Sequence, residues 1–264
     1  MFEKYKPKKI IHLAAKVGGI KENINHPADF IHENVLMNSH VIHYAYKYKV
    51  KKLLATLSNC AYPDIAKKYP MTEDQLHNNL PAPTNLAYGY SKRMADIYIK
   101  SYREQYGCKF ISAIPCSIYG PHDRFEDEKG HFLAALIKKI YFANKNNQDS
   151  IKLFGTGKPL RQYIYSEDLA KILLILLEKY DDSDPINIAP EENLSIKKIA
   201  QTAVQATASN LEIFFDKTSP DGQYRKDISS KKLFNIIGHF KFTPLLEGIK
   251  KTYQWLETNS ERIL

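Results

Sequence analysis

The sequence has 264 residues, of which 44% are hydrophobic and 12% aromatic; this excludes a disordered chain and allows one large domain, or one with a small appendage. Its net charge of +9 comes from lysines spread along the chain rather than from one basic block, so we expect no nucleic-acid partner. A net positive charge suits an anionic ligand such as a nucleotide, although solvated surface lysines explain this charge equally well.

The cysteines and the hydropathy limit the compartment and the kinds of site that we expect. Cys60, Cys108 and Cys116 are odd in number and lack the spacing of a metal site, so we expect no bound metal and a reducing, cytoplasmic location. The sequence shows no signal peptide and no apolar run long enough to span a membrane, so we expect no membrane partner.

Short apolar runs alternate with helical periodicity through the first half of the chain. The run from Lys8 to Ala15 lies between charged residues and the glycines of Lys16-Val-Gly-Gly19, which is typical of a strand buried on both faces. We expect strands at residues 8–15, 52–58 and 109–115, and helices at 29–48 and 84–106. This alternation predicts a doubly wound α/β fold with a parallel sheet.

The ends of these strands predict where a ligand binds. Right-handed crossovers bring the carboxyl ends of successive parallel strands to one edge of a sheet. Gly18, Ser58 and Ser117 lie at or just beyond such ends, so we expect them to contribute to one shared site.

The second half of the chain is more mixed and predicts a smaller α/β portion that covers the edge of the sheet and holds the substrate. A strand that begins at Arg161 runs into a helix that we expect Ser166 or a neighbour to cap, and Ser195 lies near the start of an amphipathic helix. We expect further strands at residues 151–154, 185–189 and 212–216, and helices at 131–144, 194–208 and 242–258.

Tyr88 and Lys92 form the most informative pair for chemistry. Four residues apart in a predicted helix, their side chains leave the same face. A nearby ammonium favours the phenolate form of a tyrosine, so the pair can relay a proton to a carbonyl oxygen, and Ser58 could offer the same oxygen a hydrogen bond. The spacing alone is weak evidence, because a chain with 18 tyrosines and many lysines produces it by chance. On the spacing alone, a solvated helix face is the more common explanation.

Six segments occur in a fixed order along the chain: His12-Leu-Ala-Ala15, Lys16-Val-Gly-Gly19, Ser58-Asn-Cys60, Tyr88-x-x-x-Lys92, Tyr119-Gly-Pro-His122-Asp123, and Arg161-Gln-Tyr-Ile-Tyr165 with Asp168. Together they resemble the extended short-chain dehydrogenase/reductase superfamily and, within it, the GDP-L-fucose synthase family. The resemblance implies an N-terminally truncated Rossmann-type sheet. Residues 1–125 would form an incomplete dinucleotide-binding domain and residues 126–264 mainly the substrate-binding portion, with segments that return to the sheet.

The resemblance also implies an NADPH-dependent 3,5-epimerase/4-reductase that converts GDP-4-keto-6-deoxy-D-mannose to GDP-L-fucose. Tyr88 would donate a proton to the sugar oxygen at C4, Lys92 would lower the pKa of Tyr88 and hold the nicotinamide ribose, and Ser58 would orient that oxygen. Cys60 and His131 would be the base and the acid that invert C3 and C5, because the C4 ketone acidifies both carbons. Two alternatives stay open: Cys60 as a small buried hydrophobe, and His131 as a surface residue at a helix start.

Binding roles follow from the same resemblance. The NADP(H) cofactor would contact residues of two strand ends, the Tyr88 helix and the following loop: Thr56, Leu57, Ser58, Asn59, Lys92, Pro115, Cys116, Ser117, Ile118 and His131. The GDP part of the sugar substrate would contact Lys139, Phe154, Arg161 and Asp221. Arg161 could instead form an internal ion pair, but a guanidinium fork suits a diphosphate. A homodimer would form through the Tyr88 helix and the helix before it.

The sequence departs from the family in one large respect, because it contains no G-x-x-G-x-x-G turn of the kind that binds a cofactor pyrophosphate. We expect the strand at residues 8–15 to form an open edge of the sheet, since its partner in the family belongs to that glycine-rich unit. A gene-start error, a split gene and a degraded relative all explain this departure. We expect negligible turnover by residues 1–264 alone with NADPH.

Three smaller departures concern the substrate. Asn59 stands where the family has a second hydroxyl residue, Lys139 where it has an arginine, and Phe154 where it has a tryptophan. Lysine keeps the charge but loses the bidentate fork, and phenylalanine keeps the ring but loses the indole N–H donor. A GDP-4-keto-deoxyheptose is therefore an alternative substrate, and a catalytically inactive remnant that binds a GDP-sugar or a full-length partner is an alternative function.

Overall fold

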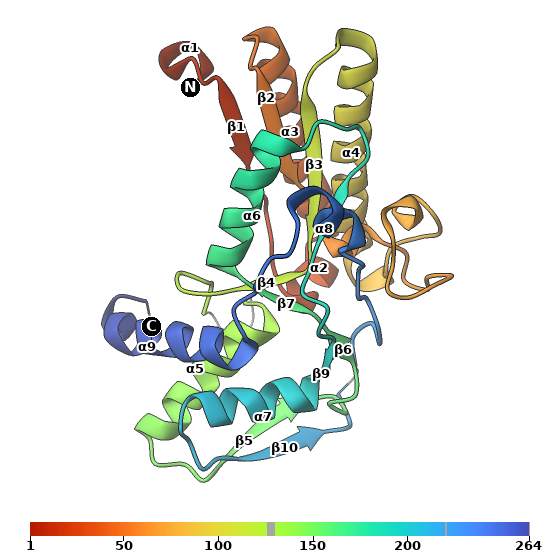
Figure 1. The fold of residues 1–264 in the computed structure, drawn as a ribbon. Helices are drawn as coiled ribbons and strands as arrows, with labels where there is room; N and C mark the ends of the chain where they lie inside the picture. Colours follow the sequence, from red (N-terminus) through yellow and green to blue (C-terminus); the bar gives the residue numbers. More distant parts are fainter. Residues whose placement is uncertain (126–129, 220, 264) are drawn as a thin grey trace.

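A four-stranded parallel sheet forms the upper part of the molecule (Figure 1). The computed structural model describes residues 1–125, 130–219 and 221–263. The strands are β1 (Lys9–His12), β2 (Lys52–Thr56), β3 (Phe110–Pro115) and β8 (Ile186–Ile188), in the order β1-β2-β3-β8. All three neighbouring pairs are parallel, so the carboxyl ends of the strands face the same way.

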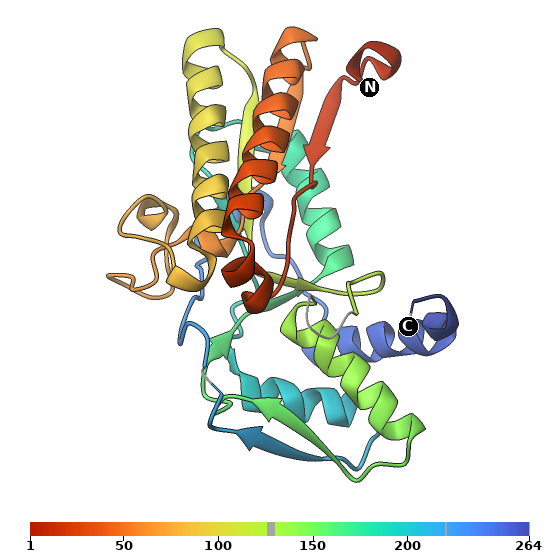
Figure 2. The ribbon, with the colours of Figure 1, turned by 180° about the vertical axis from the view of Figure 1, so that it is seen from behind.

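Helices cover both faces of this sheet. The long helices α3 (Pro27–Lys47) and α4 (Leu86–Tyr106) lie side by side on one face (Figure 2), and α6 (Ser166–Lys179) crosses the other (Figure 1). The short helix α8 (Lys231–Ile237) packs beside α6 and β8. The predicted doubly wound α/β fold with a parallel sheet is therefore confirmed.

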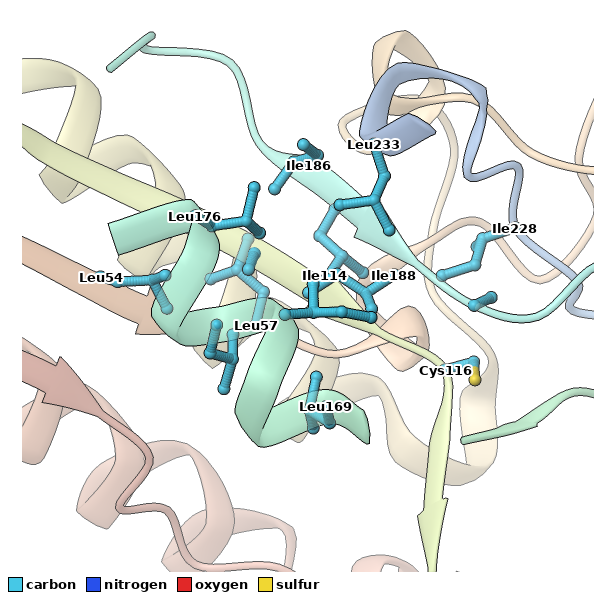
Figure 3. Packing of buried hydrophobic residues seen from close by; sticks show 14 of the residues in the cluster. Leu54, Leu57, Ile114, Cys116, Leu169, Leu176, Ile186, Ile188, Ile228 and Leu233 are labelled. Carbon is cyan, nitrogen blue, oxygen red and sulfur yellow. The ribbon is translucent and has the colours of Figure 1, made fainter. Parts of the chain in front are cut away.

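The core between the sheet and α6 explains why the central strands read as unbroken apolar runs. Figure 3 shows Leu54, Ile114 and Ile188 of the sheet packed with Leu169 and Leu176 of α6. Burial of such side chains contributes about 1.5–3 kcal/mol each relative to exposure in water. The strands therefore carry apolar residues on both faces, as buried parallel strands do.

A second group of elements lies below the sheet in Figure 1 and forms its own core. Its members are α5 (Phe132–Lys145), β5 (Ser150–Phe154), α7 (Ile196–Ala206), β10 (Glu212–Asp216) and α9 (Leu245–Ile263). β5 and β10 pair in parallel, and the apolar faces of the three helices pack together.

Two small pairs of strands run between the two groups. They are β4 (Ser117–Tyr119) with β7 (Tyr163–Tyr165), which is parallel, and β6 (Leu160–Arg161) with β9 (Leu194–Ser195), which is antiparallel. The remaining short elements are α1 (Phe2–Tyr5), α2 (Ile20–Asn25) and the 3-10 turns Asn59–Ala61, Glu73–Gln75 and Pro83–Asn85.

A buried carboxylate joins α4 to the sheet. Asp96 is 0% exposed, and its two oxygens accept hydrogen bonds from His77, at 2.8 Å, and from Ser112 of β3, at 2.9 Å. Lys100 adds an ion pair at 3.0 Å. Burial acts to raise the pKa of Asp96, but its bonds to His77 and Lys100 outweigh this and the net pKa is lowered. The network fixes the helix that carries Tyr88 and Lys92.

The outer strand β1 has the open edge that we expected. Within residues 1–125, 130–219 and 221–263, β1 pairs with β2 alone. Its residues Ile10 and Ile11 are half-buried, and the loop after it exposes 59% of Leu13. In the described part of the chain, every helix is too short or too polar to cross a bilayer.

Several local expectations were wrong. The strand expected at residues 8–15 is shorter, since β1 spans Lys9–His12, and only His12 of its four residues is buried, because the strand forms an open edge. The structure adds α2 and α8, which the sequence analysis left out. The last helix begins at Leu245 rather than Phe242, because Pro244 disfavours helical backbone at the residue before it. α6 begins after Tyr165, which makes no side-chain cap, so Ser166 does not cap this helix.

Candidate active site

The turn after β2 brings Ser58 and Cys60 against α4. Ser58 precedes the 3-10 turn Asn59–Ala61, and its hydroxyl oxygen accepts a hydrogen bond from the Cys60 N–H at 3.2 Å. A Cβ atom added at Gly89 would lie 2.8 Å from the Cys60 carbonyl oxygen. Only glycine allows this close approach, which sets Tyr88 beside the turn.

Ser58 and Tyr88 meet at their oxygens. The Ser58 side chain lies within hydrogen-bonding reach of the Tyr88 phenol, and the Cys60 thiol lies close enough to interact electrostatically with the phenol. Burial raises the pKa of Tyr88, and Cys60 adds to this while Ser58 opposes it. The phenol is therefore protonated near neutral pH. The ring of Phe30 packs edge-on against Tyr88 with 6.3 Å between centroids.

Lys92 lies on the same face of α4. It is 2% exposed, its Nζ donates a hydrogen bond to the Thr56 carbonyl oxygen at 2.9 Å, and Nζ lies 5.7 Å from the centroid of the Tyr88 ring. Burial lowers the pKa of Lys92 to about 8. We expected Lys92 to lower the pKa of Tyr88, and this was wrong for the present structure: the Lys92 ammonium bonds to Thr56, and desolvation raises the pKa of the phenol.

His131 precedes the first residue of α5 and has Asp123 as its acidic neighbour. Desolvation lowers the pKa of His131, the Asp123 carboxylate opposes this shift, and the Lys226 ammonium adds to it. Desolvation of the Asp123 carboxyl group has the opposite effect and raises its pKa. With its pKa below the ordinary value, His131 is mainly neutral at pH 7 and must take up a proton before it can act as an acid.

Lys226 is a residue of this site that the sequence analysis missed. Its Nζ donates to the Cys60 sulfur at 3.7 Å, although 166 residues separate the two along the chain. Its charge also acts on His131. With 38 lysines and arginines in the sequence, no local spacing distinguishes this one. Only the return of the chain from β10 to the turn after β2 reveals it.

The predicted cofactor residues lie along the neighbouring carboxyl ends of β2 and β3. Thr56, Ser58, Ser117 and Ile118 are at least partly exposed, and Ile118 is 40% exposed. The remaining side chains at these strand ends are buried: Leu57, Asn59, Pro115 and Cys116. Burial raises the pKa of the Cys116 thiol. The buried members can therefore offer a ligand mainly their backbone groups.

Of the four predicted substrate residues, Lys139 and Phe154 contact each other, and Arg161 and Asp221 interact electrostatically. The Lys139 Nζ lies 5.8 Å from the centroid of the Phe154 ring, which is 65% exposed. Asp221 accepts hydrogen bonds from the backbone N–H of Thr156, at 2.8 Å, and from its hydroxyl, at 2.6 Å. Arg161 interacts electrostatically with both Asp221 and Cys60, so it links this region to the turn after β2.

A cavity of about 210 Å³ is lined in part by Arg161. Its lining includes Tyr163, Glu191, Glu192 and Phe242. Two carboxylates repel a diphosphate, so this cavity does not suit the anionic part of a nucleotide sugar.

Comparison with known proteins identifies the family of this chain. Residues 1–189 match the family model described as the NAD dependent epimerase/dehydratase family. The chain belongs to this family. Among epimerase/dehydratase family members, the GDP-L-fucose synthase of Dictyostelium discoideum is 42% identical over 98% of this chain and 81% of that protein.

Solved structures of the epimerase/dehydratase fold agree. A GDP-L-fucose synthetase from Naegleria fowleri bound to NADP superposes with a TM-score of 0.92 at 40% identity, over 99% of this chain and 80% of that chain. A GDP-6-OMe-4-keto-L-xylo-heptose reductase from C. jejuni gives a TM-score of 0.89 at 26% identity, over 98% of this chain and 84% of that chain.

The arrangement in this epimerase/dehydratase family member suits proton transfer around a carbonyl group. A protonated phenol and a hydroxyl converge and can both donate to one oxygen. A thiol next to an ammonium lies beside them and, as its thiolate, can take a proton from a neighbouring carbon. Within residues 1–125, 130–219 and 221–263, no group of three or more His, Cys, Asp or Glu side chains lies together as metal ligands would.

Proposed function

We propose that this chain is a GDP-L-fucose synthase-type 3,5-epimerase/4-reductase, which converts GDP-4-keto-6-deoxy-D-mannose to GDP-L-fucose with NADPH. The observation that carries the proposal is the convergence of the Ser58 and Tyr88 oxygens with the Cys60 sulfur beside them. Relatives named GDP-L-fucose synthase, at 42% and 36% identity over 98% of this chain, support the substrate.

The proposed roles follow from the chemistry of a ketone at C4 of the sugar. The ketone acidifies the hydrogens on C3 and C5, so Cys60 removes a proton from each carbon and His131 returns one on the opposite face. The electron pair released by each C–H bond goes to the C4 oxygen, where Ser58 and Tyr88 hold the negative charge. Tyr88 then gives its proton to the same oxygen during reduction.

The residues around Lys92 suit the nicotinamide ribose of NADPH. An ammonium has three N–H donors, and Lys92 donates one of them to Thr56. The others can reach ribose hydroxyls at the carboxyl ends of β2 and β3, where Thr56, Ser117 and Ile118 lie. When bound, the cofactor supplies the hydride for C4. The protein's own part is to orient the C4 oxygen and to protonate it.

We propose that the GDP part binds where Lys139, Phe154, Arg161 and Asp221 lie. Arg161 offers a guanidinium to the diphosphate, and the exposed Phe154 ring offers an apolar face to the guanine. Lys139 and Phe154 differ from the residues that the family resemblance implies at these positions. The resemblance to a heptose reductase keeps a GDP-4-keto-deoxyheptose as a second candidate substrate.

The test separates proton transfer from reduction, because only reduction needs NADPH. Residues 1–264 are incubated in D2O with GDP-4-keto-6-deoxy-D-mannose, and deuterium at C3 and C5 is measured by mass spectrometry, first without and then with NADPH. We expect exchange in both cases. GDP-L-fucose should form only with NADPH and at a very low rate, because residues 1–264 contain no glycine-rich turn for the cofactor pyrophosphate. Binding without exchange would instead support a non-catalytic GDP-sugar binder. Faster exchange into a GDP-4-keto-deoxyheptose, tested in the same way, would make that sugar the assigned substrate.

We further propose a homodimer through α3 and α4. Five large apolar side chains on these helices are 37–50% exposed: Ile31, Leu86, Tyr90, Met94 and Ile97. Three of them line a hollow of about 410 Å³. Monomeric proteins seldom expose such a patch, and a self-complementary patch suits a two-fold axis.

Introducing charge into this patch should separate the subunits. Replacing both Met94 and Ile97 with glutamate places carboxylates in an apolar contact and should convert a dimer to a monomer in light scattering. Ile65→Glu is the matched control, because Ile65 is 78% exposed and lies outside these helices. A wild-type monomer, or dissociation by Ile65→Glu as well, would contradict the assignment.

The other expectations carry forward as proposals. We propose that the protein works in the cytoplasm, which the three free cysteines support. We also propose that residues 1–125 hold the nicotinamide end of the cofactor and that residues 126–264 mainly hold the substrate, with β8 returning to the sheet.

A further inference from the structure

Cys60 and Lys226 form a thiol–ammonium contact within the proposed site. The Lys226 Nζ lies 3.7 Å from the Cys60 sulfur, and both side chains are half-buried. Two other charged or titratable groups act on the same sulfur: Tyr88 from α4 and Arg161 from β6. The phenol is neutral near pH 7, so the charges that the sulfur meets are positive.

The backbone holds Lys226 in this place. Its carbonyl oxygen accepts a hydrogen bond from the Asn59 side chain at 3.4 Å, and Asn59 is the residue before Cys60. The Met71 N–H donates to the Asp227 carbonyl oxygen at 2.9 Å. Arg225 pairs with the Asp227 carboxylate at 2.6 Å, so the cation before Lys226 points to a carboxylate and Lys226 points to the sulfur.

We propose that Lys226 is a positioning residue that orients the Cys60 sulfur and stabilises it when it is anionic, and so makes Cys60 the base that removes the protons from C3 and C5. This inference rests on the proposed function for its catalytic meaning. In each inversion the thiolate forms an S–H bond as the C–H bond breaks, and the electron pair moves to the C4 oxygen. His131 gives a proton to the opposite face, and the proton on sulfur leaves to water. Lys226 stays an ammonium throughout and stabilises the sulfur each time it is anionic.

The first test measures the thiolate directly and needs neither substrate nor cofactor. Iodoacetamide reacts with thiolates, so the labelling rate of the Cys60 peptide is followed by mass spectrometry from pH 5 to pH 10. Lys226→Met should slow labelling at pH 7 by about tenfold, because the variant removes the cation that stabilises the anionic sulfur. Lys226→Arg should restore most of the rate because it keeps the charge.

Two controls separate this effect from unfolding and from overall charge. Labelling of Cys108 in the same sample should stay unchanged, because its charged neighbour is Arg103. Lys231→Met removes the same net charge from an exposed position at the start of α8 and should leave Cys60 labelling unchanged. Equal labelling of Cys60 in wild type and Lys226→Met, with Cys108 also unchanged, would overturn the proposal.

The second test links the thiolate to the reaction. Lys226→Met should slow deuterium exchange at C3 and C5 by about tenfold, in step with the labelling rate, and leave the binding of the GDP-sugar within about twofold. Weaker GDP-sugar binding with normal labelling would overturn the proposal and make Lys226 a substrate contact. If the wild type shows no exchange but Lys226→Met still slows Cys60 labelling, the effect of Lys226 on the sulfur is upheld and the proposed function fails.

Discussion

Replacing Cys60 with serine is expected to slow deuterium exchange at C3 and C5 of the keto sugar by about 10³-fold, within the range that general-base catalysis contributes. A serine hydroxyl ionises far less readily than a thiol, so Lys226 at 3.7 Å can no longer maintain an anionic base at this place. Reduction of a ketone supplied already inverted at C3 and C5 should stay within about tenfold, because Ser58 and Tyr88 are untouched.

The matched control for this variant is Cys108→Ser. Cys108 is half-buried like Cys60, but it packs with the cluster around Phe110 and Ile99, at the ends of β3 and α4 remote from Tyr88. Exchange in this variant should stay within about twofold of wild type. Exchange that survives in Cys60→Ser, or that falls equally in both variants, would contradict the role of Cys60 as the base.

The sheet could be predicted from the sequence because its strands β2, β3 and β8 are buried on both faces. Leu53, Leu54 and Ala55 of β2 are each 0–1% exposed, so selection for burial leaves an unbroken apolar run. α2 carries no such signal: it is six residues long, and of these only Asn23 is buried. Short elements that are fixed mainly by tertiary contacts leave little periodicity to detect.

Those residues of the site that lie on one helix or directly after one strand could be predicted from the sequence. Tyr88 and Lys92 lie four residues apart on one helix, and Ser58 follows a strand whose direction sets its place, so pattern and topology suffice for them. Lys226 reaches Cys60 only through hydrogen bonds between the segment after β10 and the loop after β2. No spacing along the chain encodes that contact.

The pKa of Tyr88 was mispredicted for a physical reason. A sequence shows that an ammonium is near a phenol, but it does not show how much water the fold removes from both. Here desolvation raises the pKa of the phenol and lowers the pKa of Lys92 to about 8, so the phenol stays protonated while Lys92 remains mainly an ammonium at pH 7. A neutral phenol has the proton that a donor needs, so burial serves the proposed reduction.

Tyr88→Phe is therefore expected to slow the reduction at C4 by about 10³-fold, measured as GDP-L-fucose formed per enzyme under single-turnover conditions with excess NADPH. The variant removes only the O–H group and keeps the ring that packs against Phe30. Deuterium exchange at C3 and C5 should fall by no more than about tenfold, because Ser58 still donates to the C4 oxygen and Cys60 still takes the proton.

Tyr90→Phe is the matched control for this variant. Tyr90 lies two residues further along the same helix and is 38% exposed, so loss of its hydroxyl should leave both rates within about twofold. An equal loss of reduction and exchange in Tyr88→Phe would mean that the phenol holds the enolate rather than protonating the alkoxide. Normal reduction in that variant would transfer the donor role to Ser58 or to water, and would remove the chemical meaning of the Tyr88–Lys92 pair.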